Sequence, residues 1–100
     1  MDTVLNLRDI TAITMAELAS CTFTNMEVYT RMEDIRVRLA SLDKAMVMSR
    51  SEKVKALLVV NTTNGFRSIT TKVLMVNPGS IIVEGNISIP MHAVYSVNIE

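Results

Sequence analysis

Cys21 and His92 are the only thiol and the only imidazole in this chain of 100 residues. A nucleophilic site needs a thiol or hydroxyl activated by a nearby base, and a zinc site usually needs several His and Cys ligands. One residue of each type, without a flanking signature, supplies neither. We expect Cys21 to be a small buried hydrophobe and His92 a polar residue at a turn. The sequence therefore predicts no catalytic residue, no metal site, no cofactor and no enzyme activity.

Basic residues form the second group with functional chemistry, because lysine and arginine bind phosphates. Residues 1–30 carry a net charge of about −3, residues 31–55 about +3 and residues 56–100 about zero. The chain as a whole is formally neutral and only 4% aromatic, so a solvated surface is the alternative interpretation of these side chains. The candidate contacts to nucleic acid or another anion are Arg31, Arg36, Arg38, Arg50, Lys53, Lys55, Arg67 and Lys72.

Two capping boxes predict the helices that would position most of these charges. Thr14 with Glu17 predicts a short helix that ends near residue 20, and Thr24 with Glu27 predicts a long helix over residues 25–48. Acidic and basic residues four positions apart, Glu27 with Arg31 and Asp34 with Arg38, are expected to pair along the long helix. The pattern leaves the state of residues 1–13 open.

Apolar residues recur along the long helix at spacings of 4, 3, 4, 3 and 4, the a/d seam of nearly three heptads. Three uses of the seam are open: packing on the chain's own core, pairing with the same helix of a second copy, and capture of a partner protein. The predicted oligomer or partner interface consists of Val28, Met32, Ile35, Leu39, Leu42 and Met46.

The second half of the chain predicts short strands separated by turns. The turn residues are Asn64-Gly65, Asn77-Pro78-Gly79 and Gly85-Asn86. Between them we expect strands over residues 53–61, 66–76 (with a bend near Thr70 and Thr71), 81–84, 87–89 and 94–99. The fold class is α+β. N-terminal helices over residues 1–50 precede a five-stranded antiparallel small β-barrel over residues 51–100, together one compact unit.

A helix followed by five short strands resembles the Sm-like small barrels. The part from Asn64-Gly65-Phe66 to the closing phrase, Ile89-Pro90 through Ile99-Glu100, resembles more particularly the YolD-like family. That family has a Gly-Phe turn after its first strand and a closing phrase of the type Ile-Pro-x-x-x-Ile-x-x-Ile-Glu. The resemblance covers about half the chain and implies a bacterial or phage accessory protein. The family is associated with DNA-damage functions, and no catalytic residues come with it.

Hydrophobic content sets the expectation for partners. The chain is 49% apolar with a mean hydropathy of +0.32, which is high for a short chain with few aromatic residues. Monomers rarely expose large apolar patches, so we expect a homo-oligomer. With one cysteine, no pattern of a secretory signal and no apolar run of 18 residues, we expect a cytoplasmic protein without a membrane segment.

The leading functional prediction is a non-enzymatic interaction module that self-associates and binds a protein partner. A first alternative is an Sm-like barrel that binds nucleic acid through the basic segment 31–55, with affinity falling steeply as salt rises. A second alternative is a binder of a small anionic ligand at an interface between protomers, which that ligand would stabilise against heat. The sequence does not identify the partner or the number of subunits.

Overall fold

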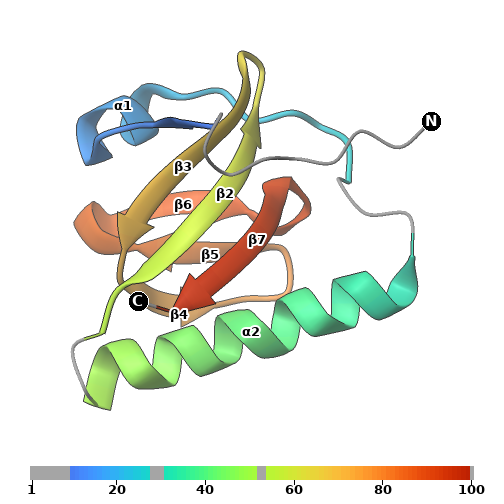
Figure 1. Ribbon diagram of the computed structural model, residues 1–100, viewed down its shortest axis with the longest axis vertical. Coiled ribbons are helices and arrows are strands. Elements are labelled where there is room, and N and C mark those ends of the chain that lie inside the picture. The colour runs from blue at the N-terminus through green and yellow to red at the C-terminus, as the bar shows by residue number, and fades with distance from the viewer. Residues whose placement is uncertain (1–9, 28–30, 52–53, 100) are drawn as a thin grey trace.

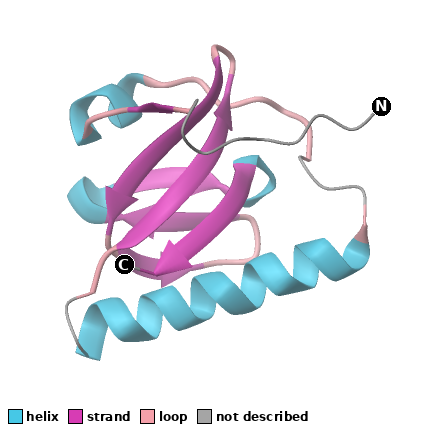
Figure 2. Cartoon of the chain, viewed as in Figure 1, coloured by secondary structure: helices cyan, strands magenta, loops and turns pink. Residues whose placement is uncertain are grey.

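The computed structural model describes residues 10–27, 31–51 and 54–99, which form two β-sheets and one long helix (Figures 1 and 2). The elements in chain order are β1 (Thr11–Ala12), α1 (Met15–Ser20), α2 (Met32–Ser51), β2 (Ala56–Thr62), β3 (Gly65–Thr71), β4 (Val73–Val76), β5 (Ser80–Val83), the 3-10 helix η2 (Glu84–Asn86), β6 (Ile87–Pro90), the 3-10 helix η3 (Met91–Ala93) and β7 (Val94–Ile99).

Tight turns form two hairpins, β2-β3 and β5-β6, as the sequence predicts, whereas the first sheet also pairs β2 with the distant β7 and pairs β1 with β3 in parallel rather than antiparallel. Asn64-Gly65 closes the antiparallel hairpin of β2 and β3, in register from Ala56 opposite Thr71 to Thr62 opposite Gly65. Gly65 has a φ of 104°, a conformation that a side chain would strain. Gly85 and Asn86 also have positive φ, and they join β5 to β6. These hairpins confirm the turn assignments.

The predicted five-stranded small barrel is wrong. The described residues form seven strands in two sheets, with orders β1-β3-β2-β7 and β4-β5-β6. The long strand predicted over residues 66–76 is divided at Lys72, where the chain leaves the first sheet and enters the second. The carboxylate of Glu84 accepts a hydrogen bond from the Lys72 backbone amide at 2.9 Å and stabilises this corner. Strands β4 and β7 each remain an edge, so the two sheets do not close into a barrel.

Helix α2 covers the side on which these two edges lie, and it packs against both β4 and β7. Figure 1 shows α2 running beneath the two sheets, with β4-β5-β6 behind β2, β3 and β7. An uncovered strand edge offers unpaired backbone groups to other chains, and a helix laid over it removes that hazard. The order of one long helix followed by strands, which the sequence predicts, is confirmed.

One hydrophobic core joins the helices to both sheets. Leu18 of α1 and Leu42 of α2 are buried in the same cluster as Leu58, Ile69 and Ile81 from the strands. The two sheets face each other across this cluster, and α2 closes it along one side. The helical region and the strands therefore share a single core.

The long helix begins later than predicted, at Met32 rather than residue 25. Thr24 caps no helix, because its backbone is used by other segments: its amide donates to the carbonyl of Asn61 at 3.3 Å. Its own carbonyl lies 2.6 Å from Nε2 of His92. Tertiary contacts thus override a local capping signal. The first capping box is confirmed, since Thr14 and Glu17 make both reciprocal bonds at 3.1 Å.

Two leucines on successive turns of α2 allow a test of this packing. Leu42 has no exposed surface and Leu39 is 44% exposed. Leu42→Ala is expected to lower the free energy of unfolding by about 3 kcal/mol, because it leaves a cavity in the core. Leu39→Ala is expected to cost about 0.5 kcal/mol or less. Denaturant unfolding of dilute protein measures both, and similar losses for the two variants would contradict the observed rotation of α2.

Candidate functional site

The buried guanidinium of Arg38 fixes α2 in place. Only 2% of this side chain is exposed, and it pairs with both carboxylate oxygens of Glu27, with Nη1 2.7 Å from Oε2. The same Nη1 donates to the carbonyl of Val94 at 3.2 Å, at the start of β7. A buried charge is tolerated when it is paired and hydrogen-bonded in this way. Arg38 therefore joins α2 to the segment before it and to β7, 56 positions further along the chain.

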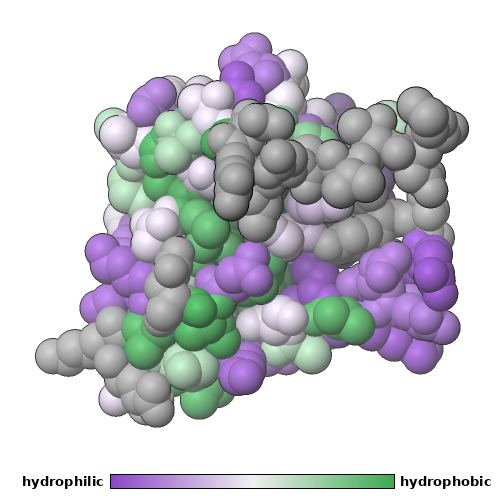
Figure 3. Space-filling view, in the orientation of Figure 1, coloured by the Kyte–Doolittle hydropathy of each residue, from purple (hydrophilic) through white to green (hydrophobic). Residues whose placement is uncertain are grey.

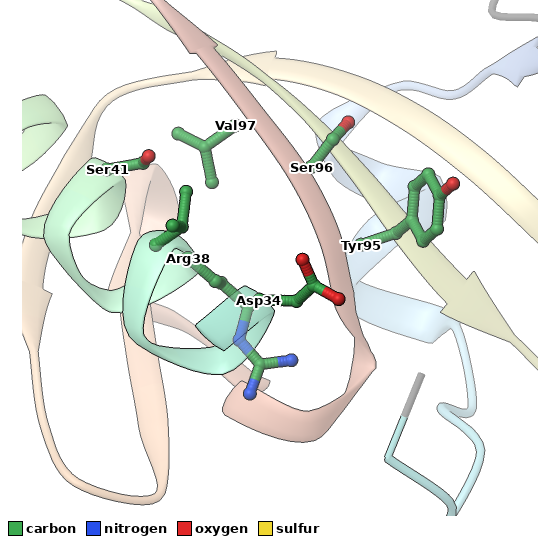
Figure 4. A pocket seen from close by; sticks show the side chains of 7 residues that line it. Asp34, Arg38, Ser41, Tyr95, Ser96 and Val97 are labelled. Carbon is green, nitrogen blue, oxygen red and sulfur yellow. The ribbon is translucent and has the colours of Figure 1, made fainter. Parts of the chain in front are cut away.

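Two ion pairs expected along the helix are not formed. Glu27 pairs with Arg38 instead of Arg31, and Arg31 pairs with Glu33 at 2.9 Å in an exposed bridge. In Figure 4 the guanidinium of Arg38 points away from the carboxylate of Asp34. The rule of four-residue spacing applies to a helix surrounded by water, whereas Arg38 lies on the side that packs against β7.

The structure divides the predicted apolar seam between the core and the solvent. Leu42 is fully buried and Met46 packs against the core, whereas Ile35 is half-buried. Met32 and Leu39 are 62% and 44% exposed. Val28 lies outside the described residues. The buried stripe of α2 instead consists of Arg38, Leu42, Ala45 and Ser49.

The opposite side of α2 exposes apolar side chains with two charges between them. We call this surface the outer face of α2; it consists of Met32, Arg36, Leu39, Ala40, Asp43 and Val47, all of them exposed. Leu74 and Met75 of β4 are also exposed, and β4 packs against α2, where Arg50 donates to the carbonyl of Leu74 at 3.0 Å. Leu74 is the extra residue of a β-bulge. Sequence reasoning missed these two residues because it assigned them to the interior of a barrel strand.

Hydrophobic and hydrophilic side chains are separated along the visible face of the molecule. In Figure 3 hydrophilic residues gather at the N-terminal end of α2, and hydrophobic ones gather toward its C-terminal half and the lower ends of the front strands. Val37 is 65% exposed, but it borders β7 rather than the outer face. The apolar surface is therefore distributed unevenly, as expected for an interaction surface.

The basic residues do not gather into one described patch. Arg38 is buried against Glu27, Arg31 pairs with Glu33, and Lys55 lies 3.8 Å from Glu84. Arg67, on β3, donates to the neighbouring carbonyl of Phe66. The remaining candidates are scattered: Arg36 and Arg50 lie on α2, Lys72 lies at the corner between the sheets, and Lys53 falls outside the described residues.

The aromatic residues are also engaged within the fold. Phe66 and Tyr95 make an edge-to-face contact, with ring centroids 5.2 Å apart. Phe23 packs against the hydrophobic core. Proteins that bind single-stranded nucleic acid usually present aromatic rings on which bases stack. These three rings, whose contacts are described, are occupied by other side chains.

Two small hollows lie between α2 and β7, and both are lined by Ser41 and Val97; Figure 4 shows the first of them. Their volumes are about 180 and 240 Å³, room for roughly six to eight water molecules at about 30 Å³ each. Ligand pockets are typically about 300–1,000 Å³. Ser96 lines the first hollow, and its buried hydroxyl has no hydrogen-bond partner among the described side chains and backbone. The hollows fit water better than a metabolite.

His92 and Cys21 have structural surroundings. Nε2 of His92 is within hydrogen-bond distance of the carbonyl oxygen of Thr24. Cys21 caps the C-terminal end of α1, because its backbone amide donates to the carbonyl of Leu18 at 3.1 Å. Within residues 10–27, 31–51 and 54–99, no group of three or more His, Cys, Asp or Glu side chains is arranged to hold a metal ion. Both residues thus make structural contacts, and Cys21 is half-buried rather than buried as predicted.

Comparison with protein-family models, with curated proteins and with solved structures gave no match. Among the described residues, no helix has the length and apolar character needed to cross a membrane.

The two glutamates that pair with arginine allow a matched test of the Arg38 anchor. Glu27→Gln is expected to lower the free energy of unfolding by about 2–3 kcal/mol, because it leaves a buried guanidinium without its carboxylate. Glu33→Gln removes the exposed partner of Arg31 and should cost less than about 0.5 kcal/mol. Denaturant unfolding at constant pH distinguishes them. If both variants lower the free energy of unfolding by the same small amount, the ion pair between Arg38 and Glu27 does not stabilise the position of α2.

Proposed function

We propose that this protein is a non-enzymatic interaction module that self-associates through the outer face of α2 and binds a protein partner. The observation that carries the proposal is the exposure of large apolar side chains on neighbouring elements. Met32, Leu39 and Val47 on α2 are between 44% and 62% exposed, and Leu74 and Met75 on β4 are 38% and 47% exposed. An apolar surface of this kind is typical of a contact with another protein.

The packing of α2 supports the choice of this face. Its inner side is already occupied by Arg38, Leu42 and Ala45, which contact the core and β7. A second molecule can therefore approach α2 only from outside. The predicted seam contributes two residues to that surface, Met32 and Leu39. Its residues Leu42 and Met46 pack in the core instead, and Val47 is the exposed apolar residue at that end of the helix. Residues on this surface can be shared with a second molecule without disturbing the core.

The remaining chemistry also favours binding over catalysis. His92 and Cys21 take part in backbone contacts that hold the segment before α2 and the end of α1. The basic side chains on described elements are dispersed, and several are paired with carboxylates. The resemblance to the YolD-like family supports a role as a bacterial or phage accessory factor, in the cytoplasm, for a module of this type.

Two exposed valines that lie about 80° apart around α2 test the proposal, because only Val47 belongs to the outer face. Val47 is 57% exposed on the outer face, and Val37 is 65% exposed beside β7. Light scattering should show wild-type protein at twice the chain mass of 11.1 kDa as concentration rises. Val47→Glu should shift the protein to monomer, because a charge is then desolvated in the contact, whereas Val37→Glu should leave the dimer intact. A wild-type monomer at every concentration up to the solubility limit would refute self-association.

A further inference from the structure

The outer face of α2 has a self-complementary order of side chains. We infer that two copies of the chain pair through antiparallel α2 helices, about a two-fold axis that passes between Leu39 and Ala40. This inference rests on the proposed self-association and adds its geometry. It names the partner as a second copy of this chain and specifies which residues meet.

The six residues of the outer face lie on one stripe of the helix. With about 100° between successive residues, Met32, Arg36, Leu39, Ala40, Asp43 and Val47 fall within an arc of about 100°. From Met32 to Val47 the stripe is about 23 Å long at about 1.5 Å per residue. A stripe of this width and length is sufficient for one helix to pack along another.

Antiparallel pairing about that axis brings together residues whose numbers add to 79. Met32 then contacts the partner's Val47, and Arg36 lies opposite the partner's Asp43. Leu39 packs on the partner's Ala40, whose small side chain allows the two helices to approach closely. Because the interface is isologous, each of these contacts occurs twice. The result is an apolar contact at each end and at the centre, with two ion pairs between them.

Charge disfavours two alternative arrangements. Parallel pairing in register would place Arg36 opposite the partner's Arg36 and Asp43 opposite the partner's Asp43. An antiparallel pairing centred on Asp43 would again bring two Asp43 carboxylates together, and it would place Arg36 opposite the partner's Arg50. Like charges across an interface are unfavourable, so the charges select the register while apolar contacts supply the affinity.

The exposed residues of β4 extend the same contact. Leu74 is placed beside the C-terminal end of α2 by the hydrogen bond from Arg50 to its carbonyl. In the antiparallel arrangement, this end of α2 lies opposite the first turn of the partner's helix. The exposed residues Leu74 and Met75 then lie at the same end of the contact as the partner's Met32, which is 62% exposed in the single chain.

Charge reversal tests the register. Arg36→Glu alone places carboxylates opposite each other in the dimer, and Asp43→Lys alone places cations opposite each other. Each variant should weaken self-association by about tenfold at low salt, since two exposed contacts are reversed. An equal mixture of the two variants should form a heterodimer of wild-type affinity, because every reversed residue then meets a complementary one. Both residues are exposed, so circular dichroism should show unchanged folding.

Cysteine crosslinking provides an independent test. In a Cys21→Ser background, chains carrying Met32→Cys should form a disulfide with chains carrying Val47→Cys, because the two positions face each other across the axis. Neither variant alone should crosslink efficiently. Disulfides between two Met32→Cys chains would instead show parallel helices.

The outcomes separate the inference from the proposed function. A dimer that is insensitive to both charge variants, or whose mixture of variants does not recover, overturns the antiparallel register and leaves self-association intact. A wild-type chain that remains monomeric overturns both. The inference is supported if mixing Arg36→Glu with Asp43→Lys restores self-association in a salt-dependent way and if Met32→Cys chains form a disulfide with Val47→Cys chains.

Discussion

The structure depends on one buried charge. The guanidinium of Arg38 binds Glu27 from the segment before α2 and the carbonyl of Val94 at the start of β7. These three positions span most of the chain, and no local pattern would bring them together. Because a buried arginine is costly without its partners, the helix has one favourable rotation about its axis. That rotation determines which side chains enter the core and which face the solvent.

Helix α2 covers two strand edges that would otherwise be exposed. The chain leaves the first sheet at Lys72, so β4 and β7 are left as edges on the same side of the molecule. Two arginines of α2 satisfy one carbonyl on each edge, Arg38 on Val94 and Arg50 on Leu74. The helix therefore covers one side of the two sheets, which do not close into a barrel. Its inner surface is used by this role, so contacts with other molecules are made by its exposed sides.

The features that sequence analysis predicted correctly are local. The Thr14–Glu17 capping box and the turns at Gly65 and Gly85 depend on residues close in the chain, and all three are present. The start of α2 was not predictable, because Thr24 and Glu27 are engaged by residues from other parts of the chain. Seam spacing could not separate Leu39 from Leu42, since both fit a heptad. Hydropathy also assigns an arginine and a serine to the solvent, although Arg38 and Ser49 lie in the buried stripe.

The residues of α2 that contact the sheets differ from those on its outer face, and this affects how the protein can evolve. The residues that secure the helix to the sheets, Arg38 and Leu42, are distinct from those on its outer face, such as Leu39 and Val47. In the proposed dimer, replacing the latter with polar residues would change the number of subunits while leaving the fold almost unchanged. The proposal thus implies that surface substitutions alone can adjust quaternary structure.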